Sequence, residues 1–134
     1  MKINIAPEFL LDTNVVLEAF WGKKPIASKV KAWIENGKIA VSTITIAEIL
    51  SKASKEETEK LKLLTSRFGS LPIDEPTAEI AGGYRKQFLR KKKKAYLLDC
   101  LIAATAKLYN LKLVTANIKD YPMKDIEIVN SSSL

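Results

Sequence analysis

The sequence contains no histidine, and Cys100 is its single cysteine. Without histidine the chain cannot build a Ser-His-Asp or Cys-His catalytic set or a zinc site with histidine ligands. One cysteine excludes an internal disulfide and any Cys-x-x-Cys motif, which is typical of a protein in a reducing compartment. If the chain is a hydrolase, carboxylates must therefore do the work, most readily by holding Mg²⁺ or Mn²⁺.

Long hydrophobic runs are also missing. No segment is long and apolar enough to cross a membrane, and residues 1–7 are too short and too polar for a signal peptide. We therefore expect a cytoplasmic protein. The chain has 134 residues, of which 47% are hydrophobic and 28% charged, and these values are typical of one globular domain. No linker or repeat divides it, so we expect a single domain over residues 1–134.

The positive charge of the chain is concentrated in one segment. Lysine and arginine number 22 against 15 acidic residues, which gives a net charge of +7. Seven of the basic residues lie in a stretch without an acidic residue: Arg85, Lys86, Arg90, Lys91, Lys92, Lys93 and Lys94. Such a segment favours contact with a polyanion, although a solvated helix end followed by a flexible lysine loop would have the same composition.

Strand and helix patterns alternate along the chain. Short apolar runs predict strands over 8–11, 39–41, 71–74, 111–115 and 126–129, and the run 131–133 is expected to be a frayed tail. Helical spacing predicts helices over 15–21, 26–36, 44–50, 56–68 and 96–109, a helix from residue 76 into the basic segment, and a helical turn at 117–121. Gly82-Gly83 inside the long helix suggests a kink or a close contact. The helix over 96–109 is apolar almost all round, so we expect it at the centre of the fold. This order predicts an α/β fold, a three-layer α/β/α sandwich with a mostly parallel sheet of about five strands.

Asp12 follows the first of these strands, in the sequence Leu10-Leu11-Asp12-Thr13-Asn14. Open α/β sheets place their ligands at the carboxyl ends of parallel strands, so Asp12 is a candidate for chemistry. An aspartate in this position is also a good N-cap for a following helix. The first strand alone does not separate these two interpretations.

Two more carboxylates stand in apolar surroundings within helices. Glu48 lies in Ile46-Ala47-Glu48-Ile49-Leu50, and Asp99 shares its helical face with alanine and isoleucine. Glu48 could instead complete a capping box with Thr45, and Asp99 could pair with a lysine or interact with the helix dipole. If these residues and Asp12 converge, however, their repulsion requires a cation among them, and an oxygen-only site favours Mg²⁺ or Mn²⁺ and hydrolysis of phosphodiesters.

The order of these motifs resembles the PIN-domain ribonucleases, particularly the VapC-like toxins of type II toxin–antitoxin (VapBC) pairs. Four motifs carry the resemblance and span nearly the whole chain: Leu11-Asp12-Thr13-Asn14, Ser42-x-x-Thr45-x-x-Glu48, Asp99-x-x-Ile102-Ala103-Ala104-x-Ala106, and Leu113-Val114-Thr115-x-Asn117-x-x-Asp120-Tyr121. Each motif is weak alone, whereas the ordered set is specific.

The resemblance implies roles for individual residues. Asp12, Glu48 and Asp99 correspond to the catalytic acidic residues that hold the metal, and Asn14 and Thr115 to supporting polar groups. Family members often place an aspartate where this chain has Asn117. Either Asn117 is a neutral metal ligand or Asp120 substitutes for the missing carboxylate; Asn117 itself could also simply cap the short helical turn.

The resemblance further implies an endoribonuclease that uses Mg²⁺ or Mn²⁺, a homodimer, and an antitoxin protein that blocks the acidic pocket. RNA phosphates would then meet the basic segment, with Arg85, Arg90, Lys91, Lys92, Lys93 and Lys94 as candidate contacts. Two alternatives remain open at this point. A metal-dependent phosphatase usually needs a second aspartate where Asn14 stands, and a non-catalytic RNA-binding module of the same fold would have lost metal binding.

Overall fold

A central sheet of four parallel strands organises the computed structural model, which describes residues 6–134. The expectation about a signal peptide therefore falls mostly on residues outside the described range. The strands run β1 (Phe9–Leu11), β2 (Ile39–Ala40), β3 (Lys112–Thr115) and β4 (Ile128–Asn130), in the spatial order β2-β1-β3-β4. Because β1 lies between β2 and β3, the residues that follow it emerge near the middle of the sheet.

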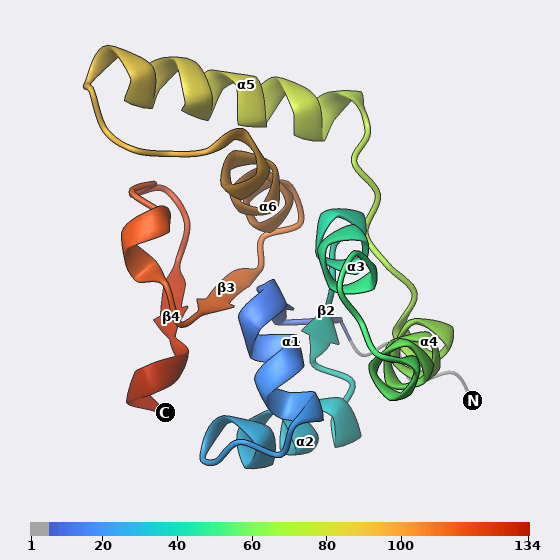
Figure 1. The fold of residues 1–134 in the computed structure, drawn as a ribbon. Helices are drawn as coiled ribbons and strands as arrows, with labels where there is room; N and C mark the ends of the chain where they lie inside the picture. The colour runs from blue at the N-terminus through green and yellow to red at the C-terminus, as the bar shows by residue number, and fades with distance from the viewer. Residues whose placement is uncertain (1–5) are drawn as a thin grey trace.

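Helices cover both faces of this sheet (Figure 1). They are α1 (Thr13–Phe20), α2 (Ile26–Glu35), α3 (Thr43–Leu50), α4 (Lys55–Phe68), α5 (Glu75–Arg90) and α6 (Leu97–Leu108). Short 3₁₀ turns follow β3 and β4, as η1 (Ile118–Asp120) and η2 (Ser131–Ser133). The predicted three-layer α/β/α architecture is confirmed.

Alternation along the strands produces two hydrophobic cores. Leu10 and Leu113 point into a core with the buried residues of α5 and α6, whereas Leu11 and Val114 point into a core with those of α1, α2 and α4. Successive side chains of a strand face opposite sides of the sheet, so two adjacent leucines in β1 can anchor both layers. Buried on both faces, β1 is held rigidly, and so is the residue at its carboxyl end.

The fifth strand predicted over 71–74 is wrong. Leu71 makes one isolated bridge to Ser42, in which the Leu71 N–H donates to the Val41 carbonyl at 2.8 Å and the Leu71 carbonyl accepts from the Thr43 N–H at 3.0 Å. The pairing does not continue, because the partner segment enters helix α3 at Thr43, directly after this bridge. Helix α5 begins at Glu75, capped by the Asp74 side chain.

Two further expectations need correction. Helix α5 runs unbroken through Gly82 and Gly83, and a Cβ at either position would meet no atom within 4 Å, so these glycines mark no close contact. The segment 131–133, expected to be frayed, forms η2. Its first residue, Ser131, is 3% exposed.

Helix α6 is central on one face only. Residues such as Ile102 and Ala103 are buried, whereas Leu97 and Leu98 in its first turn are 53% and 48% exposed. The all-round apolar pattern therefore overstates the enclosure of this helix. Among residues 6–134, no helix is long and apolar enough to cross a membrane.

Candidate active site

Asp12 lies directly after β1 and is 7% exposed. Its Oδ1 accepts from the Thr13 N–H at 2.8 Å, which makes it the N-cap of α1, and its Oδ2 accepts from the Thr115 hydroxyl at 2.8 Å. Thr115 ends the neighbouring strand β3, whose register pairs Leu11 with Val114. The two interpretations of Asp12 are thus compatible, because one carboxylate oxygen caps the helix and the other faces the carboxyl edge of the sheet.

Glu48 reaches the same edge from α3. The N-cap of this helix is Ser42, whose Oγ accepts from the Thr45 N–H at 3.1 Å, so the alternative of a capping box between Thr45 and Glu48 is wrong. Glu48 Oε1 instead accepts from the Thr13 hydroxyl at 2.8 Å. This hydrogen bond joins α3 to α1 and turns the Glu48 carboxylate toward the end of β1.

Asp99 enters from the first turn of α6, with part of its side chain buried. Burial raises its pKa most, the negative charges of Asp120, Asp12 and Glu48 raise it further, and the resulting pKa is about 6. The ion pairs found within residues 6–134 include no lysine or arginine partner for Asp99, which disfavours the pairing alternative. Asp99 therefore stands among like charges.

Tyr121 is a member of this cluster to which the sequence gave no role, although it ends the fourth motif. It is 3% exposed, and its hydroxyl donates to Asp99 Oδ1 at 3.5 Å, a long hydrogen bond. Burial first, and then the negative charges of Asp12 and Asp99, raise the pKa of Tyr121 far above its usual value. The phenol therefore stays protonated and remains a hydrogen-bond donor.

The carboxylates lie close enough to repel one another but are not drawn together on a single point. Within residues 6–134, no group of three histidine, cysteine or acidic side chains has the geometry to hold one metal ion. The raised pKa of Asp99 is consistent with this finding, because electrostatic repulsion acts over longer distances than the roughly 2.0–2.6 Å of a metal–oxygen bond. Joint coordination of one ion would require at least one carboxylate to turn. The donor set itself, composed of carboxylate oxygens, fits Mg²⁺ or Mn²⁺.

The remaining polar candidates differ in position. Asp120, partly buried at the end of η1, contributes the largest electrostatic increase to the pKa of Asp99. Asn117 is exposed, makes no side-chain capping hydrogen bond, and donates its backbone N–H to the Thr115 hydroxyl at 3.0 Å. Asn14 is exposed and lines a groove of about 470 Å³ with Thr13 and Glu48. The structure thus brings Asp120 near the carboxylates, leaves Asn14 at the rim, and places Asn117 at the N-cap position of η1, where its side chain makes no capping hydrogen bond.

The basic segment has one residue that stabilises the fold, Arg85, and an exposed end, residues 91–94. Arg85 donates from Nη1 to the Ala95 carbonyl at 2.7 Å and is only partly exposed, so it ties the loop before α6 to α5. Helix α5 ends at Arg90, and residues 91–94 form an exposed turn and loop. Lys94 Nζ lies 5.2 Å from the centre of the Tyr96 ring; the interaction with Tyr96 raises the pKa of Lys94 most, and the charge of Asp120 adds to the increase. The end of this segment therefore lies near the acidic cluster.

The sequence did not predict Thr13 as a site residue either. Its position between Asp12 and Asn14 was a weak signal, since three polar residues in succession follow a buried strand. Its contact with Glu48 spans 35 positions of the chain, and no local pattern indicates it.

Comparisons with known proteins find relatives of this chain by sequence and by fold. The family model described as PIN domain matches residues 9–125. The chain is 28% identical to Ribonuclease VapC10 of Mycobacterium tuberculosis over 85% of this chain and 86% of that protein. It is 30% identical to Toxin FitB of Neisseria gonorrhoeae over 90% of this chain and 96% of that protein.

A solved structure has the same fold. The crystal structure of VapBC2 from Rickettsia felis, bound to a DNA fragment from their promoter, superimposes with a TM-score of 0.77 and 26% identity. The match covers 90% of this chain and 96% of that chain. The relatives and this chain are therefore alike in sequence and in fold over nearly their whole lengths.

Proposed function

The chain belongs to the PIN-domain family, and on that premise we propose that it is a Mg²⁺- or Mn²⁺-dependent endoribonuclease and the toxin of a toxin–antitoxin pair. The observation that supports this proposal best is the arrival of Asp12, Glu48, Asp99 and Asp120 from four segments at one edge of the sheet. The names of the relatives, a ribonuclease and a toxin, agree with it.

Each carboxylate has a role in this mechanism. Asp12, Glu48 and Asp99 are the proposed metal ligands, and Asp120 takes the fourth acidic position in preference to Asn117, because its charge reaches Asp99. A bound ion of this kind lowers the pKa of a water molecule and stabilises the charge that develops on the phosphodiester oxygens.

Three hydroxyl groups orient these ligands. Thr115 holds Asp12 and Thr13 holds Glu48, each at 2.8 Å, while Tyr121 donates to Asp99. Hydrogen bonds of this kind fix the rotation of a ligating carboxylate and are part of a metal site's design. Asn14, at the rim of the adjoining groove, is positioned to meet the RNA rather than the ion.

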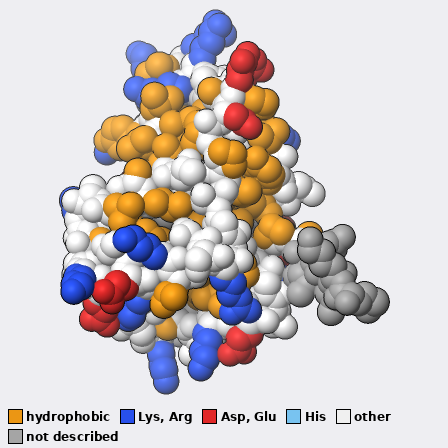
Figure 2. All heavy atoms as spheres, turned by 90° about the vertical axis from the view of Figure 1, so that its right-hand side faces the viewer, with side chains coloured by type: hydrophobic (Ala, Val, Ile, Leu, Met, Phe, Trp, Pro, Cys, Tyr) orange, Lys and Arg blue, Asp and Glu red, His pale blue; other side chains and the backbone are white. Residues whose placement is uncertain are grey.

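The proposal includes two protein partners, an antitoxin and a second copy of the chain, and implies a cytoplasmic location. Figure 2, which faces the side of α3 and α4 in Figure 1, shows hydrophobic side chains gathered over the middle and upper part of that face. Exposed hydrophobic residues of the chain include Leu50 on α3 and Leu97 and Leu98 on α6. Uncovered apolar surface of this kind is typical of protein interfaces.

An RNA cleavage assay tests the proposal. Wild-type protein should cut a single-stranded RNA in Mg²⁺ and stop in EDTA, and Asp12→Asn and Asp99→Asn should each lower the rate by about a hundredfold or more. Asp74→Asn is the matched control, because Asp74 caps α5 away from the cluster and asparagine caps equally well. Undiminished cleavage in EDTA, or in either site variant, would overturn the mechanism. RNA binding by the wild type without cleavage would favour the non-catalytic alternative.

A further inference from the structure

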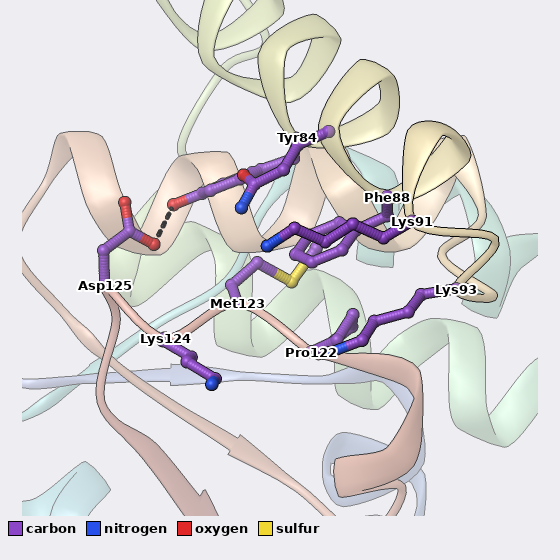
Figure 3. A pocket seen from close by; sticks show the side chains of 9 residues that line it. Tyr84, Phe88, Lys91, Lys93, Pro122, Met123, Lys124 and Asp125 are labelled. Atoms are coloured by element: carbon purple, nitrogen blue, oxygen red, sulfur yellow. Dashed lines mark hydrogen bonds between the residues drawn. The ribbon is translucent and has the colours of Figure 1, made fainter.

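A second cavity, of about 250 Å³, lies between the end of α5 and the segment 122–125 (Figure 3). We propose that it binds one nucleotide unit of the single-stranded RNA substrate, with the phosphate against Lys91 and Lys93 and the base against an apolar floor. This proposal rests on the proposed ribonuclease function. It specifies a second place, outside the acidic cluster, where the protein would hold the RNA strand.

The floor of the cavity is apolar. Phe88 and Met123 line it and are 3% and 4% exposed, and Pro122 adds a further apolar surface. Nucleobases bind single-strand readers mainly through their flat faces, against aromatic and apolar side chains, so contact of this kind is tolerant of sequence. A base in the cavity would meet the small apolar surface that Phe88 and Met123 leave uncovered, and this surface would not read which base it is.

The wall supplied by the turn after α5 is positively charged. Lys91 and Lys93 extend from this turn across the cavity, whereas the amino group of Lys124 on the other wall points away from them (Figure 3). The ion pairs found within residues 6–134 include none of these three lysines. The two ammonium groups are thus available to a phosphate.

The acidic residue in the wall does not neutralise these lysines. Asp125 accepts a hydrogen bond from the Tyr84 hydroxyl at 2.8 Å through Oδ1, and its Oδ2 pairs with Lys107 at 3.6 Å. Burial, and next the contact with Asp125, raises the pKa of Tyr84 well above its usual value, so the phenol stays a donor. The dashed line in Figure 3 marks this contact, which turns the carboxylate toward α5 and α6.

The cavity adjoins the acidic cluster through a short piece of chain. Tyr121 contacts Asp99, and the next two residues, Pro122 and Met123, line the cavity. Lys94 follows Lys93 directly and feels the charge of Asp120. An RNA strand that follows residues 121–123 from the carboxylates would reach the cavity, where the lysines would make salt-sensitive contacts with its backbone.

Two double variants separate this cavity from general electrostatic attraction. K91Q/K93Q removes the two lysines that line it, and R90Q/K92Q removes the same charge from the alternate positions of the same segment, which do not line it. Affinity for a single-stranded RNA would be measured by fluorescence anisotropy in EDTA, where the protein binds without cutting. We expect about tenfold weaker binding for K91Q/K93Q and no more than about twofold for R90Q/K92Q.

Cleavage kinetics in Mg²⁺ provide the second readout. K91Q/K93Q should raise KM and leave kcat unchanged, because a flanking contact is made equally in the ground and transition states. Equal losses of affinity in the two double variants would overturn the proposed binding of a nucleotide in the cavity. They would indicate only diffuse electrostatic attraction between the basic segment and RNA. A 5′-mononucleotide that bound the wild type as tightly as RNA would also overturn the proposal, because the ligand would then be a free nucleotide. Absence of RNA cleavage by the wild type would instead contradict the proposed function itself.

Discussion

At the scale of single residues, three of the four carboxylates in the site each accept a hydrogen bond from a hydroxyl group. Thr13, Thr115 and Tyr121 donate to Glu48, Asp12 and Asp99 respectively. Hydrogen bonds to charged acceptors typically contribute about 1.5–3 kcal/mol, which offsets part of the repulsion among the acids. The remaining repulsion among the carboxylates lowers the stability of the folded protein and favours the binding of a cation, and both effects can be measured.

Asp99→Asn should stabilise the protein in EDTA at neutral pH. The pKa of Asp99 is raised from 3.8 to about 6, so its charged form is disfavoured in the folded chain above that pH. The penalty is absent below about pH 4 and complete above about pH 6. Thermal unfolding should show a Tm higher by about 2–4 °C at pH 7.5, with the gain vanishing as the pH falls to 4. A lower Tm for this variant at neutral pH would contradict this prediction and would mean that the charged form of Asp99 stabilises the folded protein.

Thr13→Val should lower the cleavage rate more than it lowers stability. The change removes the hydroxyl that orients Glu48 at 2.8 Å but keeps the size of the side chain. We expect a fall in kcat of about tenfold or more, and a loss of about 1 kcal/mol of unfolding free energy. Thr13→Ser retains the hydroxyl and should restore most of the activity. Equal rates for the valine and serine variants would remove Thr13 from the mechanism.

At the scale of elements, helix beginnings determine where the carboxylates lie. Asp12 is the N-cap of α1 and lies at the carboxyl edge of the sheet. Ser42 is the N-cap of α3 and precedes Glu48 by six residues. Asp12 comes directly after β1, and Ser42 comes shortly after β2. The position of the catalytic side chains is thus built into the capping of α1 and α3.

Two cap substitutions test this dependence. Ser42 caps α3 in the interior, with 0% exposure, and Ser54 caps α4 in an exposed capping box. Ser42→Ala and Ser54→Ala should each cost about 1 kcal/mol in chemical denaturation. Cleavage should fall in Ser42→Ala, because α3 carries Glu48, and stay unchanged in Ser54→Ala. Similar cleavage rates at similar stability would show that α3 does not position the site.

The sequence predicted the elements better than their pairing. Every expected helix is present, because helical periodicity and glycine stops are local signals. The fifth strand was not formed, since the segment that Leu71 pairs with enters helix α3 at Thr43, and local sequence patterns do not show this partner. Asp12, Glu48 and Asp99 could be singled out because charged groups in apolar surroundings are conspicuous. Tyr121 could not, because a buried tyrosine has an ordinary structural explanation until its neighbours across the fold are known.

At the scale of the whole molecule, charge of opposite sign is separated into two regions. Acidic groups gather at the carboxyl edge of the sheet, whereas the net charge of +7 comes from residues 85–94. A polyanion such as RNA would be attracted to the basic region. It could approach the acidic cluster only where a bound cation compensates the negative charge of the carboxylates. Lys94, whose pKa the charge of Asp120 helps to raise, lies at the end of the basic region.

The salt dependence of RNA binding measures this attraction. Lys91, Lys93 and Lys94 face the proposed path of the strand, whereas Lys92 does not line the cavity. Replacing all four by glutamine should therefore reduce the slope of log affinity against log salt by about 2, at about 0.7 per single-strand contact. Anisotropy titrations from about 0.05 to 0.3 M salt would provide the slope. An unchanged slope would make the segment a solvated loop.

Direct measurement of Mn²⁺ binding tests most simply whether the converging carboxylates hold a divalent cation. Isothermal titration calorimetry would compare the wild type with Asp12→Asn and with the charge-matched control Asp74→Asn. The wild type and the control should bind Mn²⁺ with equal affinity, and Asp12→Asn should bind at least about tenfold more weakly. Equal Mn²⁺ binding by Asp12→Asn, or no binding by the wild type, would contradict the account.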